Sequence, residues 1–374
     1  MPELGAVIFV CRNKHMKEFD EVFVDKTKYG TKLKTSDYKE CGKYPIIDQG
    51  QETIAGYTDA EDGVFKEVPV IIFGDHTRVI KYVDKPFFLG ADGVKVLRSK
   101  YLDANYRYLF YALLNLKIPN TGYNRHFKWL KEAKIQYPTL KQQEKVVGIL
   151  DKIEEVIAAR NKQLNALDEL IQARFVEMFG DPVCNSHDLP EATLPELGEF
   201  GRGVSKHRPR NDSNLLGGRY PLIQTGDVAT SELYITSYTN TYSELGLKQS
   251  KMWKKGTLCI TIAATIAKTA ILAFDACFPD SVVGFIANEK TNNVFVHYWF
   301  TFFQSILEAQ APESAQKNIN LKILSELKII VPKKELQDEF VTFVNQVNKS
   351  KVEIQQALEK TQLLFDSLMQ QYFG

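Results

Sequence analysis

Residues 131–180 (KEAKIQYPTLKQQEKVVGILDKIEEVIAARNKQLNALDELIQARFVEMFG) are repeated without a gap as residues 325–374 (SELKIIVPKKELQDEFVTFVNQVNKSKVEIQQALEKTQLLFDSLMQQYFG), 194 positions further along the chain. The apolar pattern recurs together with a set of identical residues. The identical pairs are Glu132 and Glu326, Lys134 and Lys328, Ile135 and Ile329, Pro138 and Pro332, Gln143 and Gln337, Val147 and Val341, Leu164 and Leu358, Leu170 and Leu364, Phe179 and Phe373, and Gly180 and Gly374. A repeat of this length predicts two copies of one structural module, so we expect the chain to act at two related places.

The repeated segments are predicted to be long helices. Each follows a proline, Pro138 or Pro332, and ends at a glycine, Gly180 or Gly374, as expected at helix boundaries. Apolar residues recur at the three- and four-residue spacing of a coiled coil. The seam positions are Leu150, Ile153, Ile157, Arg160, Leu164, Leu167, Ile171, Arg174 and Met178 in one copy, and Val344, Val347, Lys351, Ile354, Leu358, Thr361, Phe365, Leu368 and Tyr372 in the other. Each helix therefore needs a partner, and the other copy is the nearest candidate, although such a stripe also suits packing on the neighbouring domain.

The regions before the helices are predicted to be globular domains. Residues 1–140 and 191–333 each have the size of one ordinary domain. Residues 141–180 and 334–374 are the helices that follow them, and residues 181–190 form a linker within a stretch rich in Pro, Asp and Asn. Short apolar, β-branched runs predict strands at residues 68–73, 257–262 and 281–286. The expected fold class is α+β, with two mixed α/β domains joined by two long helices in a pseudo-twofold internal repeat.

The two domains share short landmarks, although their sequences differ far more than those of the helices. Tyr44-Pro45 and Tyr220-Pro221 are each followed by an apolar pair and, a little later, by a glycine. The tetrapeptide PELG occurs at residues 2–5 and again at 195–198, which is weaker evidence because the match is so short. We therefore expect each half of the chain to consist of a variable domain followed by a helix whose sequence is better preserved between the two halves.

The composition is that of an ordinary folded protein. With 44% hydrophobic and 25% charged residues, the chain of 374 residues can bury substantial cores. Its five cysteines include no CxxC pair, which favours reduced thiols in the cytoplasm over disulfides or structural zinc. Charged residues lie within or beside the longest apolar stretches, so we expect neither a membrane span nor a signal peptide.

Basic residues are concentrated in two loops, although the net charge of the chain is only +1. Residues 26–43 (KTKYGTKLKTSDYKECGK) and 201–220 (GRGVSKHRPRNDSNLLGGRY) each lie at or just before a Tyr-Pro landmark. Mobile basic side chains on glycine-containing loops suit contacts with phosphates and guanine edges. Many such runs are merely solvated surface loops, but two of them at matching places favour DNA binding.

Catalytic motifs are missing from the sequence. There is no GxxxxGK[ST] loop, no complete GxGxxG, no HExxH, and no Asn/Asp-Pro-Pro-aromatic tetrapeptide of an adenine methyltransferase. Asp280 with Glu289-Lys290 resembles a nuclease pattern, but that pattern needs one residue between its Glu and Lys. The six histidines lack metal-ligand spacing. We therefore expect neither a catalytic site nor a metal site in this chain.

Taken in order, these features resemble the DNA specificity subunits of type I restriction-modification systems, in which two target-recognition domains alternate with two conserved helical regions. The resemblance covers the whole chain and rests on the duplicated helix block, on the two basic-loop segments, and on the approach to the second helix through Asn318, Lys322 and Leu324. It implies that the helices form an antiparallel coiled coil and that each domain reads one half of a bipartite site in double-stranded DNA. The helices would set the spacer and dock modification subunits, and restriction subunits through them.

The resemblance also implies which chemistry belongs to the partners. S-adenosylmethionine, ATP and Mg²⁺ are expected on the partner subunits, and this chain is expected to hold no cofactor and to be no catalyst by itself. Three alternatives stay open on the sequence. They are a coiled-coil protein-interaction scaffold that does not bind DNA, a specificity subunit of a related fused nuclease-methyltransferase system, and an autonomous nuclease.

Within each domain we expect polar side chains on loops to reach base edges and basic ones to anchor phosphates. The candidates are Lys28, Lys32, Lys34, Gln49 and Gln51 in the first domain, and Arg202, Lys206, Arg208, Arg210, Gln224 and Thr225 in the second. The loop before each helix adds Tyr123, Asn124, Arg125 and His126 in one copy, and Gln316, Lys317 and Asn318 in the other. A local cap or turn role explains Asn124 and Asn318 equally well.

Overall fold

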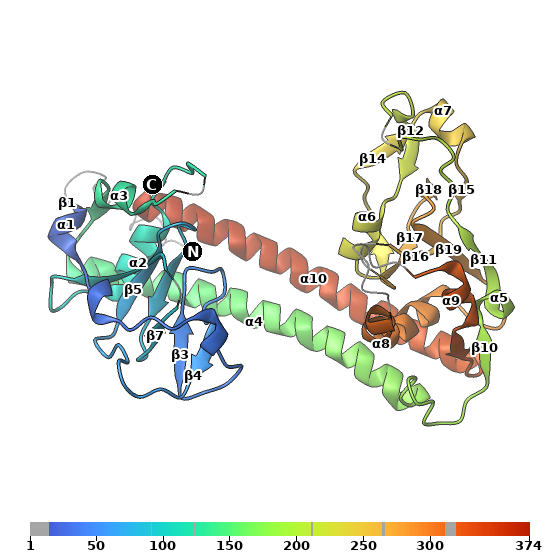
Figure 1. Cartoon of the computed structure of the whole chain (residues 1–374), viewed down its shortest axis with the longest axis horizontal. Helices are drawn as coiled ribbons and strands as arrows, with labels where there is room; N and C mark the ends of the chain where they lie inside the picture. Colours follow the sequence, from blue (N-terminus) through green and yellow to red (C-terminus); the bar gives the residue numbers. More distant parts are fainter. Residues whose placement is uncertain (1–14, 91, 123, 211, 264–265, 311–318) are drawn as a thin grey trace, which may run out of the picture. The chain divides into compact units, whose positions relative to one another are not determined.

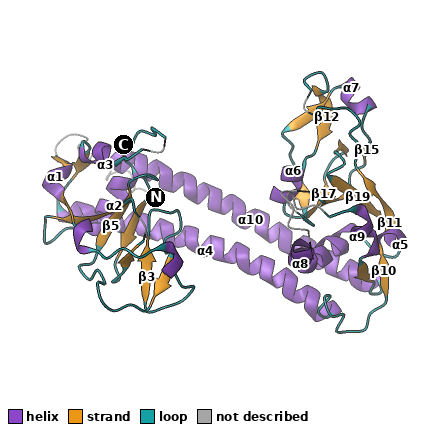
Figure 2. Ribbon diagram, viewed as in Figure 1, coloured by secondary structure: helices purple, strands orange, loops and turns teal. Residues whose placement is uncertain are grey.

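The computed structural model describes residues 15–90, 92–122, 124–210, 212–263, 266–310 and 319–374. The chain divides into two compact units, in each of which helices and strands are mixed (Figures 1 and 2). Unit 1 comprises residues 1–161 and 356–374, and unit 2 comprises residues 162–355. Each unit therefore contains one predicted domain together with a part of both long helices. The mixed helix and sheet class and the long helices are confirmed.

Unit 1 contains three small sheets. The first pairs β1 (Met16–Glu18) with β9 (Lys134–Gln136) in antiparallel fashion. The second is antiparallel, in the order β2 (Phe23–Asp25), β8 (Val94–Ser99), β5 (Val70–Gly74) and β6 (Ile80–Val83). The third has the order β4 (Gly56–Thr58), β3 (Tyr44–Ile47) and β7 (Phe88–Leu89), with β3 parallel to β7. The helices are α1 (Phe19–Val22), α2 (Tyr106–Leu114) and α3 (Phe127–Lys131), with short 3₁₀ turns at Thr27–Tyr29 and Thr35–Asp37.

Unit 2 repeats this plan with additions. β10 (Glu191–Thr193) pairs with β20 (Lys328–Ile330). A larger sheet has the order β11 (Gly198–Arg202), β19 (Val282–Ala287), β16 (Leu258–Thr261), β17 (Thr269–Leu272) and β13 (Tyr234–Ile235). The third sheet has the order β14 (Asn240–Tyr242), β12 (Leu216–Leu222), β18 (Ala276–Cys277) and β15 (Met252–Trp253). The helices are α5 (Leu194–Leu197), α6 (Thr225–Thr230), α7 (Glu244–Lys248), α8 (Asn293–Gln310) and α9 (Leu321–Glu326).

The long helices are α4 (Leu140–Phe179) and α10 (Lys334–Phe373), each of 40 residues. At ~1.5 Å per residue, each is about 60 Å long. Every position of the predicted seam is buried or half-buried, whereas most of the positions between them are exposed. Gln143 and Gln337, which match in the repeat, each donate a side-chain hydrogen bond to the carbonyl oxygen of the proline that precedes the helix, at 2.9 Å in both cases. The repeat therefore extends from the sequence to the way each helix begins.

The central strand of each domain is buried on both faces, which explains its unbroken apolar sequence. In β5, Ile71 and Phe73 pack with α1 and α2, whereas Val70 and Ile72 face the core beside β3 and β7. Side chains alternate along a strand, so two cores on opposite faces demand apolar residues at every position. β16 is buried in the same two-sided way, with Leu258 and Ile260 in one core and Cys259 in another.

The two domains have the same topology, although the sequence predicted little likeness beyond landmarks. The strand order β2, β8, β5, β6 corresponds to β11, β19, β16, β17, and β4, β3, β7 corresponds to β14, β12, β18. The capping box of Glu18 and Glu21 at α1 corresponds to that of Thr193 and Glu196 at α5. Residues 195–198 of the second domain therefore match residues 20–23. The other PELG copy, at residues 2–5, lies outside the described residues.

Candidate nucleic-acid interface

The core of each domain is completed by the end of the long helix that belongs to the other repeat. In unit 1, the ring of Phe373 in α10 lies 5.3 Å from that of Tyr108 in α2. In unit 2, the ring of Phe179 in α4 lies 5.1 Å from that of Phe295 in α8. Phe179 and Phe373 are matching residues of the repeat, and both α2 and α8 begin beside an asparagine, Asn105 or Asn292, whose side chain accepts a backbone hydrogen bond. Both domains are thus built on both helices.

Within each unit, α4 and α10 run antiparallel. In unit 1, Leu150 clusters with Met369, and Arg160 further along α4 donates hydrogen bonds to Ala357 and Thr361, earlier in α10. In unit 2, Asp168 accepts a hydrogen bond from Lys351 at 2.7 Å, and Arg174 pairs with Glu339 at 3.0 Å. Each of these five pairs includes at least one predicted seam position. Polar seam residues that meet specific partners fix the register of a helix pair, which apolar residues alone fix only loosely.

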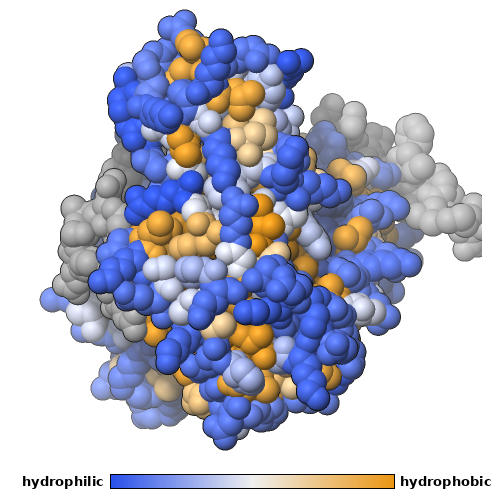
Figure 3. Space-filling view, turned by 90° about the vertical axis from the view of Figure 1, so that its right-hand side faces the viewer, coloured by the Kyte–Doolittle hydropathy of each residue, from blue (hydrophilic) through white to orange (hydrophobic). Residues whose placement is uncertain are grey.

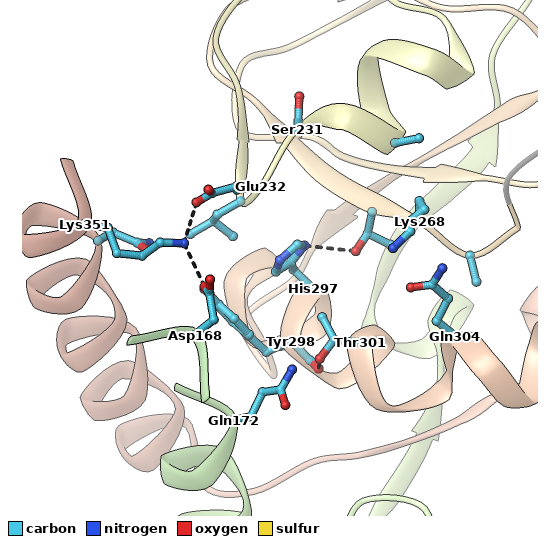
Figure 4. Close-up of a pocket in the computed structure, with 15 residues that line it drawn as sticks. Asp168, Gln172, Ser231, Glu232, Lys268, His297, Tyr298, Thr301, Gln304 and Lys351 are labelled. Carbon is cyan, nitrogen blue, oxygen red and sulfur yellow. Dashed lines mark hydrogen bonds and ion pairs between the residues drawn. The ribbon is translucent and has the colours of Figure 1, made fainter. Parts of the chain in front are cut away.

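A polar cavity of about 260 Å³ lies in unit 2 where α4, α8 and α10 meet the residues between α6 and β13 (Figure 4). The ammonium group of Lys351 in its wall is bound by Asp168 at 2.7 Å and by Glu232 at 2.6 Å. Burial lowers the pKa of Lys351, but the hydrogen bonds with the two carboxylates outweigh it, so the net shift is upward. Lys351 therefore stays charged and ties the second domain to both helices.

His297 lines the same cavity and is nearly fully buried (Figure 4). Its Nδ1 lies 2.9 Å from the hydroxyl of Thr269. Burial lowers the pKa of His297 to about 4, so the ring is neutral at pH 7. At this cavity Lys351, Asp168 and Glu232 satisfy one another, and together they join the second domain to both helices.

Unit 1 joins its domain to α4 through a different cluster. Arg107 in α2 forms ion pairs with Asp151 at 2.7 Å and with Glu154 at 2.6 Å. The hydroxyl of Tyr111 donates to Asp151 at 2.6 Å. Tyr111 corresponds to Tyr298 of α8, whose side chain is hydrogen-bonded to Asn348 of α10. A tyrosine at the same place in each domain therefore bonds to the long helix that follows that domain.

Three of the predicted contact residues of the first domain gather around Asp92, in the turn between β7 and β8. Lys32 forms an ion pair with the Asp92 carboxylate at 2.6 Å, and the side-chain amide of Gln49 donates to the Asp92 carbonyl at 3.0 Å. Lys32 lowers the pKa of Asp92 through its hydrogen bond and its charge, and Arg125 contributes through its charge. Gln49 also accepts from the backbone of His76, so it ties three loops together. It would have to leave these bonds to reach a base.

The remaining candidates of the first domain lie apart. Lys28 lies over the ring of Tyr29 at 4.9 Å, as Lys26 does at 4.8 Å. Lys34 and Gln51 are exposed on loops. The side-chain amide of Asn124 donates to Thr121, which is the local turn role left open by the sequence. His126 is fully buried against the Asp75 carbonyl, so it is a core residue and not a surface contact.

In the second domain, two predicted arginines share one carboxylate. Arg208 and Arg210 both form ion pairs with Asp280, in the turn between β18 and β19. Arg202, the last residue of β11, and Lys206, on the loop that follows that strand, are both exposed. Gln224 caps α6 reciprocally with Asp227, whose carboxylate accepts from the Gln224 backbone at 2.7 Å, and Thr225 is the first residue of that helix. Tyr123, Gln316, Lys317 and Asn318 lie outside the described residues.

Several residues that organise these surfaces were not predicted from the sequence. Asp92 was not a candidate, and Asp280 was considered only for a nuclease pattern, although an acidic residue facing a basic loop is a signal that could have been sought. Arg107 and Tyr111 look like ordinary helix residues until α2 is placed against α4. Lys351 was noted only as a polar interruption of the seam. Their roles depend on contacts between distant segments, which no local pattern reveals.

On the face shown in Figure 3, hydrophobic residues form areas that are separated by hydrophilic ones. Among the described residues, no helix combines the length and the apolar character needed to cross a membrane. In the same part of the chain, no group of three or more His, Cys, Asp or Glu side chains is placed to hold a metal ion.

Comparisons with known proteins give a consistent result. The family described as the type I restriction modification DNA specificity domain matches residues 13–169 and 191–363. The specificity subunit of the type I restriction enzyme EcoR124I/EcoR124II of Escherichia coli is 25% identical over 361 residues, covering 86% of this chain and 85% of that protein. The S subunit of a type I restriction-modification system from M. genitalium has a similar fold, with a TM-score of 0.56 at 18% identity over 98% of both chains. A chain from a structure of the type I R-M system, described for its complex assembly and conformational transition, has a TM-score of 0.55 at 18% identity over 97% of this chain and 95% of that one.

Proposed function

The chain belongs to the type I restriction-modification DNA specificity family, and from this membership we propose that each of its two domains reads one half of a bipartite DNA site. It is a type I specificity subunit. The observation that carries the bipartite proposal is the duplicated topology, in which two domains of the same fold present different loops at matching places. Two domains whose loops differ in sequence suit a DNA site whose two halves differ in sequence.

We further propose that α4 and α10 form an antiparallel coiled coil that sets the spacing between the half-sites. The antiparallel contacts within each unit and the buried seam support this. A helix of about 60 Å is longer than one turn of the DNA duplex, which rises ~34 Å. Base pairs that no domain reads would then lie between the half-sites, and helix length would determine their number.

The basic loops are proposed to anchor the duplex. Lys28, Lys32, Lys34, Arg125, Arg202, Lys206, Arg208 and Arg210 are the proposed phosphate contacts, with Gln51, Gln224 and Thr225 as candidates for base edges. Phosphate contacts by such residues position the protein, and base contacts supply the sequence preference. Gln49 and Asn124, whose side chains are held within the fold, are weaker candidates than they were from the sequence.

The helices are proposed to dock the modification subunits. Leu170 in α4 and Leu364 in α10 are matching residues of the repeat, and both are exposed, at 46% and 51%. Exposed leucines at duplicated places suit two copies of one partner. We propose that S-adenosylmethionine, ATP and Mg²⁺ act on the modification and restriction subunits, that this chain is not itself a catalyst, and that the complex works in the cytoplasm.

Methylation mapping in a host that expresses this chain with its modification subunits tests the proposal. The expected result is one methylated motif with two specific halves and an unspecific spacer. Exchange of residues 191–333 for the matching region of a relative should change one half and leave the other intact. Methylation at sites that ignore this exchange would contradict the assignment of one half-site to each domain.

A second measurement tests the docking surface. Leu170→Asp and Leu364→Asp should each remove one modification subunit from the assembled complex, measured by its mass in solution, and the double variant should remove both. Leu102→Asp, at a fully exposed leucine that is not part of either long helix, is the control. Unchanged assembly of the double variant would exclude this surface.

A further inference from the structure

We propose that Asp92 and Asp280 are positioning residues for the two DNA-reading loops: in the free chain each carboxylate holds the basic side chains of its loop, and a DNA phosphate replaces it on binding. The inference deepens the proposed function and rests on it. It concerns Asp92, which no motif in the sequence marks, and Asp280, which the sequence marks only as part of an incomplete nuclease pattern.

The two aspartates occupy equivalent places in the duplicated topology. Asp92 stands two residues before β8 begins, and Asp280 stands two residues before β19 begins. In both cases the strand before the turn, β7 or β18, pairs in parallel with the first strand after the basic loop, β3 or β12. The strand after the turn, β8 or β19, pairs with the strand before that loop, β2 or β11. Each turn is therefore held beside its own basic loop by strand pairing.

Both aspartates use this position in the same way. Asp92 binds Lys32 at 2.6 Å, from the loop between β2 and β3. Asp280 binds Arg208 at 3.2 Å and Arg210, from the loop between β11 and β12. The loops differ in sequence and in the type of cation, yet the carboxylate recurs. A chance surface pair gives no reason for an acid at the same topological place in two divergent domains.

The exposure of these groups makes the exchange feasible. The side chain of Lys32 is 46% exposed, and those of Arg208 and Arg210 are 54% and 44% exposed. Ion pairs in contact with water are weak, so a phosphate can displace the carboxylate at small cost. Until then the pair restricts the long side chains to one region of the surface. Once freed, the aspartate is repelled by the nearby phosphate. This repulsion weakens DNA binding that depends on phosphate contacts alone.

Other ion pairs of the first basic loop do not share this pattern. Lys39 and Lys43 pair with Asp59 and Glu61, which follow β4. In unit 2, the acid that follows the corresponding strand β14 is Glu244, which binds Arg219. Arg219 belongs to the predicted basic stretch, but it lies within β12 and outside the loop between β11 and β12. Only the carboxylate before the β8 or β19 strand recurs with the same kind of partner among the described residues.

The test is DNA binding by the full chain with Asp280→Asn, on a duplex of random sequence, as a function of salt. Loss of the carboxylate should raise affinity at low salt by about threefold to tenfold, because two weak ion pairs no longer compete with phosphate. The slope of log K against log[salt] should become steeper by up to about one, because no freed carboxylate takes up a cation on binding. Asp92→Asn, which frees a single lysine, should raise affinity by about twofold.

Matched controls separate this role from general charge. Asp275→Asn makes the same charge change at an aspartate that pairs with Lys254 at 2.8 Å outside the loop, and it should have little effect. Asp280→Glu keeps the carboxylate and should behave as the unmodified chain. In the Asp280→Asn background, Arg208→Gln with Arg210→Gln should abolish the gain, as expected if the aspartate acts through these arginines.

Three results would overturn the proposal. Unchanged affinity and slope in Asp280→Asn would show that the pair does not compete with DNA. Weaker binding to the methylated motif alone would assign Asp280 to base reading, and weaker binding to every duplex would assign it to folding. If the unmodified chain and its assembled complex bind no DNA at all, the proposed function itself fails.

Discussion

Phe179 and Phe373 hold matching places at the ends of the two long helices, but the two units bury them differently. Phe179 is fully buried and touches the rings of Phe175, Phe295 and Phe340. Phe373 is half-buried, and Tyr108 is its closest aromatic partner among the described residues. The C-terminal end of each long helix therefore contributes a ring to a core, and the ring from α4 is more deeply buried than the ring from α10. The repeat preserves the position of this phenylalanine, but not its contribution to stability.

The largest expected effect comes from removing these rings. Phe179→Ala should destabilise unit 2 by about 3–5 kcal/mol, since a fully buried ring is replaced by a cavity. Phe373→Ala should destabilise unit 1 by about half as much, because part of the ring is already in water. Hydrogen exchange followed separately in residues 191–333 and 15–140 measures both. Equal losses in the two units, or loss in the wrong unit, would refute the comparison.

The second-largest effect is expected from acid, which should lower the unfolding free energy of unit 2 through His297. His297 in unit 2 corresponds to Phe110 of unit 1, which does not titrate. The folded pKa of His297 is about 4 against 6.5 in the unfolded chain, so its contribution is fully present above pH 6.5 and is lost as the pH falls to 4. The loss amounts to about 3 kcal/mol, at ~1.36 kcal/mol per pH unit. His297→Phe should flatten this part of the curve of unfolding free energy against pH; an unaltered curve would show that His297 does not cause it.

The matching tyrosines should differ by a smaller amount. Tyr111 donates to the charged Asp151, whereas Tyr298 is bonded to the neutral Asn348. Tyr111→Phe should therefore cost about 1.5–3 kcal/mol and Tyr298→Phe about 0.5–1.5 kcal/mol, because hydrogen bonds to charged groups are stronger. Chemical denaturation gives both values. The reverse order would mean that packing around the rings, and not the hydrogen bond, sets the cost.

The smallest effects are expected on the proposed DNA-binding surface, where one exposed cation from each domain can be compared. Lys34→Ala and Arg202→Ala should each weaken binding to any duplex and reduce the salt slope by about 0.9, the value for one phosphate contact. The unfolding free energy should not change, since both side chains are exposed. A slope that changes in only one variant would show that the two domains hold their half-sites with different residues.

The sequence predicted the helices well because their signal is local. Proline, glycine and the apolar seam mark residues 141–180 and 334–374, and α4 and α10 fall within one residue of those limits. The sequence predicted Lys32, Arg208 and Arg210 as candidate DNA contacts because a basic loop is also a local feature of the sequence. Whether these residues contact DNA stays a prediction.

The shared strand order of the two domains could not be predicted from local sequence patterns in this way. Loops of different length separate the matching strands, so the offset between equivalent residues changes from element to element. Pairing between β2 and β8, or between β11 and β19, joins residues far apart in the chain, and no periodicity reports it. The acid partners Asp92 and Asp280, and the buried His297, become visible only once that pairing is known.

The ring that closes the first core has a consequence for synthesis. Tyr108 is translated long before Phe373, so part of the apolar surface of the first domain stays uncovered until α10 has been made. A nascent chain that stalls before α10 would expose that surface to chaperones and proteases. Completion of the first core therefore depends on the synthesis of α10.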